Sequence, residues 1–233
     1  MKIGIIKEKS NRVLITPDTT KSLISQGHNV FFSKDCAKNS GFSNDDYLMN
    51  GATMLENNKE LINECSLISS YNLPDTEELN VFKEDHILLT YSNIVNNGEK
   101  ARLLSINNST LIGIEYIENN GVRDIANKIS KLVSKISFNM ISYFYNKPIE
   151  GSGNIIENLP YIEKTNVTIL GCGLVGKELL KSFSNKNCVV SVFDKNFDSF
   201  DDLEDLRASC FNISDSRLEK CLLESDIVIS SIS

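Results

Sequence analysis

The chain has 233 residues, 41% of them hydrophobic and 24% charged, so it can bury one large core or two modest ones, and we predict two domains. Its formal net charge of −7 and pI near 5.0 disfavour a nucleic acid or an anionic membrane as partner, because the average field of the protein would repel both. A small-molecule ligand is favoured instead.

The hydropathy of the sequence shows neither a membrane-spanning segment nor a secretion signal. No apolar run approaches the roughly 20 residues that span a bilayer, and the N-terminal residues lack the apolar centre of a signal peptide. We therefore expect a cytoplasmic protein. The six cysteines form no C-x-x-C pair and have no histidine cluster beside them, which predicts free, mostly buried thiols and no metal site.

Short apolar runs and helical patterns alternate along the first half of the chain. The predicted strands are Lys2 to Ile6, Val30 to Ser33, Leu67 to Ser70, Ile87 to Tyr91 and Leu111 to Glu115. The predicted helices are Asp18 to Gln26, Asp45 to Asn50, Glu60 to Cys65 and Lys100 to Ile106. Strands that alternate with helices indicate a parallel sheet, so the fold class is α/β.

A long helix is predicted from Ile125 to Tyr145, where apolar residues recur at helical spacing. We expect it to bridge two domains. Lys147-Pro148 ends the pattern, and Gly151-Ser152-Gly153 begins a loop that leads to the next strand. The predicted organisation is therefore an N-terminal substrate-type α/β domain (1–124), a linking helix (125–148) and a second domain (149–233).

A glycine-rich turn is the most informative motif of the second domain. The run Gly171-Cys172-Gly173-Leu174-Val175-Gly176 joins a buried strand, Asn166 to Leu170, to a helical pattern, Lys177 to Asn185. In such a motif Gly171 permits the turn, Gly173 lets the backbone approach a pyrophosphate, and Gly176 lets the helix pack near the strand. The N–H groups of the helix N-terminus then face the phosphates.

An acidic residue completes this dinucleotide-binding pattern. The next strand, Val189 to Phe193, ends at Asp194, roughly 20 residues past the glycines, as the fingerprint requires. A carboxylate at that place accepts hydrogen bonds from both ribose hydroxyls and repels a 2′-phosphate, so NAD is favoured over NADP. Lys195 beside it weakens that preference. The alternative is a tight turn without a ligand, with Asp194 as a solvated strand end.

The second domain is expected to be a partial Rossmann domain. Ala208 to Ile213 and Asp226 to Ser230 are predicted strands, with a helix from Ser216 to Glu224 between them. A complete sheet of this type has six strands, and the chain ends at Ser233 before they are all present.

A series of short motifs runs along nearly the full chain and is most specific near the N-terminus. These motifs are MKIGIIKE, Arg12-Val13, Thr16-Pro17, Gly27-His28-Asn29-Val30, Gly41-Phe42-Ser43, Tyr47, Gly51-Ala52, Ile87 to Tyr91, Glu115-Tyr116, Lys147-Pro148 and the glycine motif. In their residues and order they resemble the alanine dehydrogenase and nicotinamide nucleotide transhydrogenase family, whose relatives include lysine-forming saccharopine dehydrogenase.

The resemblance implies a binding site and a reaction. Family members hold the substrate between the two domains and transfer a hydride between the nicotinamide and a 2-imino acid or amine. Arg12 would hold the substrate carboxylate, a task suited to its planar fork. Ser130, in the long helix, joins the glycine motif, Asp194 and Lys195 among the expected cofactor contacts. Without the resemblance, Arg12 would be interpreted as an unpaired surface residue.

Two positions depart from the family pattern. Where the dehydrogenases have a lysine in a Lys-x-Lys-Glu-Pro stretch, this chain has Asn72, and where they have a proton-transferring histidine it has Asn93. Asparagine hydrogen-bonds a carbonyl or carboxylate but does not titrate near neutrality. Losing a positioned proton-transfer group typically costs about 100- to 10,000-fold in rate.

Three functions are compatible with this sequence. The chain is an NAD-dependent oxidoreductase of amino or imino acids, or an NAD(H)-binding regulatory pseudo-enzyme, or a truncated product whose role is assembly with a partner. A small carboxylate is the expected substrate. A homo-oligomer or a partner chain is expected to cover the open edge of the sheet.

Overall fold

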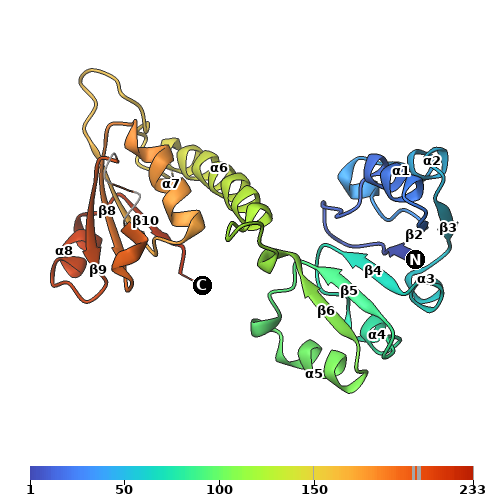
Figure 1. The fold of residues 1–233 in the computed structure, drawn as a ribbon. Helices are drawn as coiled ribbons and strands as arrows, with labels where there is room; N and C mark the ends of the chain where they lie inside the picture. The colour runs from blue at the N-terminus through green and yellow to red at the C-terminus, as the bar shows by residue number, and fades with distance from the viewer. Residues whose placement is uncertain (149, 201–202, 204–205, 233) are drawn as a thin grey trace. The chain divides into compact units, whose positions relative to one another are not determined.

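The structure is a computed structural model that describes residues 1–148, 150–200, 203 and 206–232. Ser233 lies outside the described residues. The chain divides into two compact units, Met1–Arg123 and a second that begins at Asp124 (Figure 1). The long helix, α6 (Asp124–Asn146), belongs to the second unit.

The first unit is built on a six-stranded parallel sheet with the order β3-β2-β1-β4-β5-β6. Its strands are β1 (Lys2–Ile5), β2 (Asn29–Ser33), β3 (Thr53–Leu55), β4 (Leu67–Ser70), β5 (Ile87–Thr90) and β6 (Thr110–Gly113). Its helices are α1 (Pro17–Ser25), α2 (Asn44–Met49), α3 (Asn58–Glu64), α4 (Thr76–Leu79) and α5 (Gly98–Ile106), with short 3-10 turns η1 (Lys38–Ser40), η2 (Ile94–Asn96) and η3 (Ile114–Tyr116). The order reverses between β1 and β4, where ligands bind in open sheets of this kind.

Local sequence explains where the helices of the first unit begin and end. The Thr16 hydroxyl accepts a hydrogen bond from the N–H of Thr19, and Pro17 occupies the first turn of α1. Ser43 and Asp46 form a capping box at the start of α2. Gly27 follows α1 with φ of 86°, a conformation that glycine adopts without strain.

Three features of this unit differ from the sequence prediction. The strand predicted to run to Glu115 ends at Gly113, because the chain turns into η3 and carries the Glu115 carboxylate back to the amide of Ser92. Strand β3 and helix α4 were not predicted, since three or four residues are too few to show a period.

The second unit has a four-stranded parallel sheet with the order β10-β7-β8-β9. Its strands are β7 (Thr165–Leu170), β8 (Cys188–Asp194), β9 (Ala208–Asn212) and β10 (Ile227–Ser230), and its other elements are α7 (Leu174–Ser184), η4 (Phe197–Phe200) and α8 (Arg217–Glu224). The apolar face predicted for α7 is buried in the core beside β7 and β8. The predicted α/β fold with a Rossmann-type second domain is confirmed.

Helix α6 packs against α7 through Ser134, whose hydroxyl contacts the Val175 carbonyl oxygen, and through Phe138, whose ring centroid is 5.0 Å from that of Phe183. Ser130 and Ser134 are its buried positions near α7, whereas Leu132, Ile136 and Met140 of the apolar pattern are exposed within the described chain. No helix of the described residues is long and apolar enough to cross a membrane.

All six cysteines are free thiols, three of them buried and three half-buried, so the predicted burial holds for half of them. Burial raises the pKa of Cys36 and of Cys65 to about 12. These thiols stay protonated near neutrality and pack as small apolar groups.

Candidate functional site

The glycine turn between β7 and α7 has the local geometry that its sequence predicts. Gly171 has φ of 95°, and a Cβ there would lie 3.0 Å from the backbone of Ser231. A Cβ on Gly176 would lie 2.1 Å from the carbonyl oxygen of Gly171. Both positions therefore require glycine, the first for its backbone conformation and the second for the close approach of helix and turn.

Gly173 is different, because the space above it is open. A Cβ on this exposed residue would meet no protein atom within 4 Å. Gly173 is also the N-cap of α7, and the first turn of the helix carries no acidic side chain. The open space thus lies at a helix N-terminus whose partial positive charge favours an anion such as a phosphate.

A cleft of about 220 Å³ adjoins this turn and contains the predicted acidic residue. It is lined by Gly171, Gly173, Phe193, Asp194, Lys195, Ile213, Ser231 and Ile232. Four of the eight predicted cofactor contacts, Gly171, Gly173, Asp194 and Lys195, therefore line one cleft.

Asp194 ties the end of β8 to the glycine turn. Its Oδ2 accepts a hydrogen bond from the N–H of Cys172 at 2.5 Å, and its Oδ1 accepts one from the N–H of Asn196 at 2.8 Å. Partial burial acts to raise the pKa of this carboxyl, but the hydrogen bonds from Asn196 and Cys172 outweigh it and hold the pKa below its usual value. The group is ionised at neutral pH.

The carboxylate of Asp194 keeps capacity for a ligand. An ionised carboxylate has about four acceptor positions, and the backbone groups of Cys172, Asn196 and Lys195 that contact Asp194 leave part of this capacity open. The residues present fit a dinucleotide: an open glycine at a helix N-terminus for the phosphates, and an acceptor at the end of the second strand for ribose hydroxyls.

The remaining cofactor residues lie around the start of α7. Leu174 is exposed and Val175 is half-buried. The Ser134 hydroxyl lies 2.7 Å from the carbonyl oxygen of Ser130 and 3.1 Å from that of Val175, which joins α6 to the first turn of α7. Ser130 is buried and contributes its carbonyl oxygen to this contact, and Ser134 is a positioning residue that the sequence did not single out.

In the first unit, Arg12 lies against an aromatic residue that follows β4. Its guanidinium carbon is 5.0 Å from the centroid of the Tyr71 ring, and its Nη1 donates a hydrogen bond to the Tyr71 hydroxyl. The Tyr71 ring stacks on Tyr91, with centroids 5.7 Å apart and planes 5° from parallel. Residues after β1, β4 and β5 therefore meet at the carboxyl edge of the sheet.

Asn72 is held by Glu8, which follows β1. The Glu8 carboxylate accepts hydrogen bonds from the N–H of Tyr71, from the N–H of Asn72 at 2.8 Å and from the Asn72 side-chain amide at 3.2 Å. Burial raises the pKa of Glu8, although these hydrogen bonds oppose the change. A second cleft, of about 260 Å³, lies here and includes Glu8 and Asn72 in its lining.

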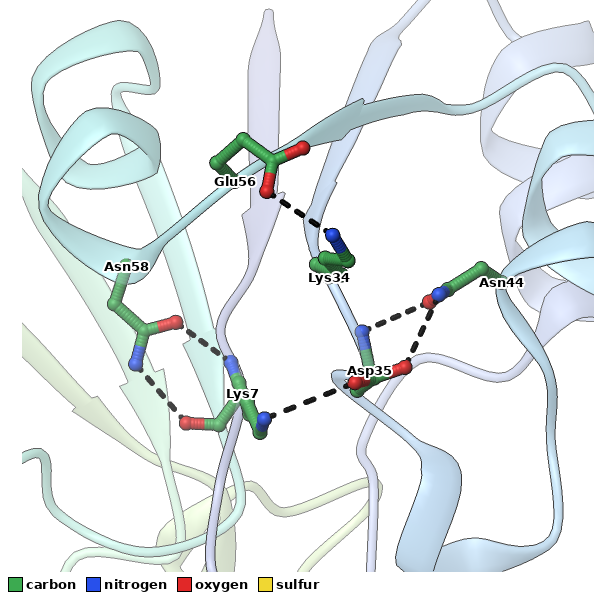
Figure 2. A network of polar contacts seen from close by, with 6 residues as sticks. All are labelled: Lys7, Lys34, Asp35, Asn44, Glu56 and Asn58. Atoms are coloured by element: carbon green, nitrogen blue, oxygen red, sulfur yellow. Dashed lines mark hydrogen bonds and ion pairs between the residues drawn. The ribbon is translucent and has the colours of Figure 1, made fainter.

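The chain just before Glu8 is fixed by a polar network (Figure 2). The Asn58 side chain bonds both backbone groups of Lys7, accepting from its N–H at 2.8 Å and donating to its carbonyl at 3.0 Å. Asp35, whose amide donates to Asn44, lies 3.9 Å from the Lys7 ammonium. The adjoining cleft, of about 820 Å³, contains none of the predicted site residues. Two of its lysines pair with two of its carboxylates, Lys7 with Asp35 and Lys34 with Glu56 at 3.3 Å.

Asn93 occupies a strained turn after β5. It has φ of 39°, in the left-handed region, and its N–H donates to Glu115 at 3.0 Å. Its side-chain oxygen accepts a hydrogen bond from Asn96 at 2.9 Å. Glu115 also accepts from the hydroxyl and N–H of Ser92, at 2.6 and 3.0 Å, so this carboxylate anchors the whole turn.

Arg12, Asn72 and Asn93 thus follow three strands that are adjacent in the sheet, β1, β4 and β5. Sequence reasoning missed the residues that hold them, which are Glu8, Tyr71, Tyr91 and Glu115. Tyr71 directly follows the buried strand β4, and Glu8 comes shortly after the buried strand β1; those positions were the signal available in the sequence.

The chain has two units, each built on a parallel α/β sheet. The second unit carries a glycine turn and an acidic residue at the end of its second strand, and these features define a two-domain protein of the dinucleotide-binding class. Two family models match, "Alanine dehydrogenase/PNT, N-terminal domain" over residues 4–131 and "Alanine dehydrogenase/PNT, C-terminal domain" over residues 137–233. The chain belongs to this family, and the resemblance stated from its sequence is confirmed.

Curated relatives and a solved structure agree with this assignment. The chain is 28% identical to an alanine dehydrogenase of Staphylococcus saprophyticus and 30% identical to one of Staphylococcus haemolyticus, and it is covered completely in both comparisons. A solved L-alanine dehydrogenase superposes with a TM-score of 0.80 at 25% identity, over 98% of this chain and 65% of that one. The chain spans 64% of the length of the two curated relatives. Members of the family use NAD, which supports the predicted cofactor.

Proposed function

We propose that this chain is an NAD-dependent oxidoreductase that acts on a small 2-amino or 2-imino acid. The observation that carries the proposal is the glycine turn, where Gly173 leaves open space at the N-terminus of α7 and Asp194 keeps free acceptor positions. Arg12, held at the strand ends of the first unit, supports the choice of a carboxylate as substrate.

The chemistry divides between the cofactor and the chain. The nicotinamide supplies or accepts the hydride. Arg12 binds the substrate carboxylate through paired N–H groups, and the side-chain amides of Asn72 and Asn93 hydrogen-bond a carbonyl oxygen or a water molecule. Because neither asparagine titrates, solvent makes the proton transfers, and we expect turnover to be slower by about 100- to 10,000-fold than with a positioned acid or base.

A second function is favoured by the hydrogen bonds that Asn72 and Asn93 make within the protein. The backbone and side-chain amides of Asn72 are bonded to Glu8, and the side-chain oxygen of Asn93 is bonded to Asn96. Both residues contribute to the fold of their turns. This favours, as the alternative, an NAD(H)-binding regulatory or assembly subunit without catalysis.

Binding and turnover together separate these functions. NADH is titrated and its fluorescence recorded, and NADH oxidation is then measured with pyruvate or glyoxylate plus ammonium, and NAD reduction with L-alanine. The oxidoreductase requires both binding and turnover. Binding without turnover on any of these substrates would refute it and support the alternative, and no binding at millimolar nucleotide would refute both.

Asp194 provides a test of the cofactor site itself. Asp194→Ala removes the acceptor for the ribose hydroxyls, so we expect NADH affinity to fall by about tenfold while NADPH affinity falls less or improves. Asp198→Ala, at an exposed carboxylate nearby in the sequence, is the control. If Asp194→Ala binds NADH as the parent does, the ribose contact is placed wrongly.

A further inference from the structure

Arg12 combines two properties that point to an external anion. It is half-buried, and no carboxylate of the described residues lies within ion-pairing distance of it. Its side chain instead contacts the face and the hydroxyl of Tyr71. The hydrogen bond to that hydroxyl uses one of the five N–H groups of the guanidinium, and the other four suffice for a bidentate contact with a carboxylate.

Tyr71 is itself held from three directions. Its N–H donates to the Glu8 carboxylate. Its carbonyl oxygen accepts hydrogen bonds from the N–H of Tyr91 at 3.1 Å and from the Thr90 hydroxyl at 3.3 Å. Its ring stacks on that of Tyr91. A residue fixed in this way is a rigid surface for the flexible side chain of Arg12.

We propose that Tyr71 is a positioning residue that orients the Arg12 guanidinium for the carboxylate of a monocarboxylic substrate. Holding a long side chain in one rotamer before the ligand arrives reduces the entropy lost on binding. A single oriented guanidinium also matches one carboxylate, because Asn72, bonded to Glu8, adds no second positive charge. The inference rests on the proposed function and names the substrate class of that same site.

Substitutions at Tyr71 separate the ring from the hydroxyl. Pyruvate binding is measured by titration calorimetry in the presence of NADH for the parent, Tyr71→Phe and Tyr71→Leu. We expect pyruvate affinity to fall about threefold in Tyr71→Phe, which loses the hydroxyl, and about tenfold in Tyr71→Leu, which also loses the ring. NADH affinity should stay unchanged, and any turnover should show a raised KM for pyruvate with kcat nearly constant.

Tyr116→Leu is the matched control. Tyr116 lies under Arg123, whose guanidinium carbon is 5.8 Å from the ring centroid, so the variant removes a similar arginine–aromatic contact of the first unit. Pyruvate affinity should be that of the parent.

A double-mutant cycle with Arg12 decides whether Tyr71 acts through the arginine. In an Arg12→Ala background, Tyr71→Leu should change pyruvate affinity by less than about twofold. A further tenfold loss of pyruvate affinity in the Arg12→Ala background would overturn the positioning role. It would also be overturned if Arg12→Ala lost pyruvate affinity while Tyr71→Leu kept the affinity of the parent. If the parent does not bind pyruvate, the proposed function and this inference fall together.

A spectroscopic measurement separates failure of this inference from failure of the proposed function, because it needs no substrate. In the parent, the Arg12 Nε–H resonance should be shifted by the ring current of Tyr71, and the shift should persist in Tyr71→Phe and disappear in Tyr71→Leu. An identical arginine spectrum in the parent and in Tyr71→Leu would overturn the inference while leaving the proposed function standing.

Discussion

The three glycines of the turn differ in what a side chain would meet. A Cβ on Gly176 would be 2.1 Å from a backbone oxygen, whereas one on Gly173 would have no protein neighbour within 4 Å. Gly176→Ala should therefore lower the free energy of unfolding by about 1–3 kcal/mol through overpacking. Gly173→Val, at φ of −72°, meets no steric clash and should cost at most about 1 kcal/mol for the poorer N-cap, but it should abolish NADH binding by filling the space for the pyrophosphate.

Thermal melts compare the stability of Gly176→Ala and Gly173→Val with that of the parent, and titrations compare their NADH affinity. A Gly173→Val protein that binds NADH as tightly as the parent would show that the open space is not the phosphate site.

Glu115 makes the stability of the first unit depend on pH. Burial acts to raise its pKa, but hydrogen bonds from Ser92 and Asn93 outweigh burial and lower the pKa. A carboxyl whose pKa is lower in the folded state stabilises the protein above its unfolded pKa, about 4.3, and this contribution is lost as the pH falls through the folded value.

Glu115→Gln should thus lower the free energy of unfolding by about 1–2 kcal/mol at pH 7, and the difference from the parent should shrink below about pH 4. Urea unfolding at several pH values measures it, with Glu84→Gln, at an exposed position, as the control. A difference that stays constant from pH 7 to pH 3 would contradict the assigned hydrogen bonds.

At the scale of the element, the extent of helix α6 could be predicted from the sequence, but the face that packs against α7 could not. The apolar pattern predicted its length to within a residue or two. The face against α7 is formed instead around Ser134, which is 1% exposed, while Met140 of the apolar pattern is 54% exposed. Small residues let two helices approach closely, and this pairing depends on the partner, which periodicity does not describe.

Substitutions on the two faces of α6 should have unequal effects. Ser134→Leu overpacks the contact with α7 and loses the bond to Val175, so we expect a loss of about 1–3 kcal/mol in the free energy of unfolding. Met140→Ser, on the exposed face, should change it by less than about 0.5 kcal/mol. Urea unfolding of both variants tests this, and equal effects would mean that the helix packs through its other face.

At the scale of the whole molecule, the division into two units predicts where a protease cuts. Arg12 is bonded to Tyr71, and Arg102 and Arg217 lie in helices, whereas Arg123 and Arg207 lie outside helices and strands and are exposed. An arginine-specific protease should therefore cleave after Arg123 and after Arg207 before it cleaves elsewhere. Cleavage after Arg123 separates the two units, because it lies between residues 123 and 124. Mass spectrometry identifies the fragments, and early cleavage at Arg102 would contradict the division.

Much of the fold could be predicted because each unit repeats a simple pattern. Strand and helix types follow from local periodicity, and the predicted elements of the glycine turn agree with β7, α7 and β8 within a few residues. Helix α4 could not be predicted because four residues show no period. Strand β3 depends on its pairing with β2, and the end of β6 at Gly113 depends on the contact of Glu115 with Ser92, so local sequence predicts neither. The expectation of a homo-oligomer or a partner chain stays a prediction.

The sequence by itself determined the α/β class, the family, the glycine turn and the residues that bear its chemistry, because these depend on residue types at fixed local spacing. Only the tertiary structure decided how those residues are held. It showed Asp194 bonded to the turn, Asn72 bonded to Glu8, and Arg12 lying on Tyr71, contacts between residues up to 64 positions apart in the chain. Such contacts form where strands become neighbours in a sheet, and strand order is a property of the folded chain that local spacing does not encode.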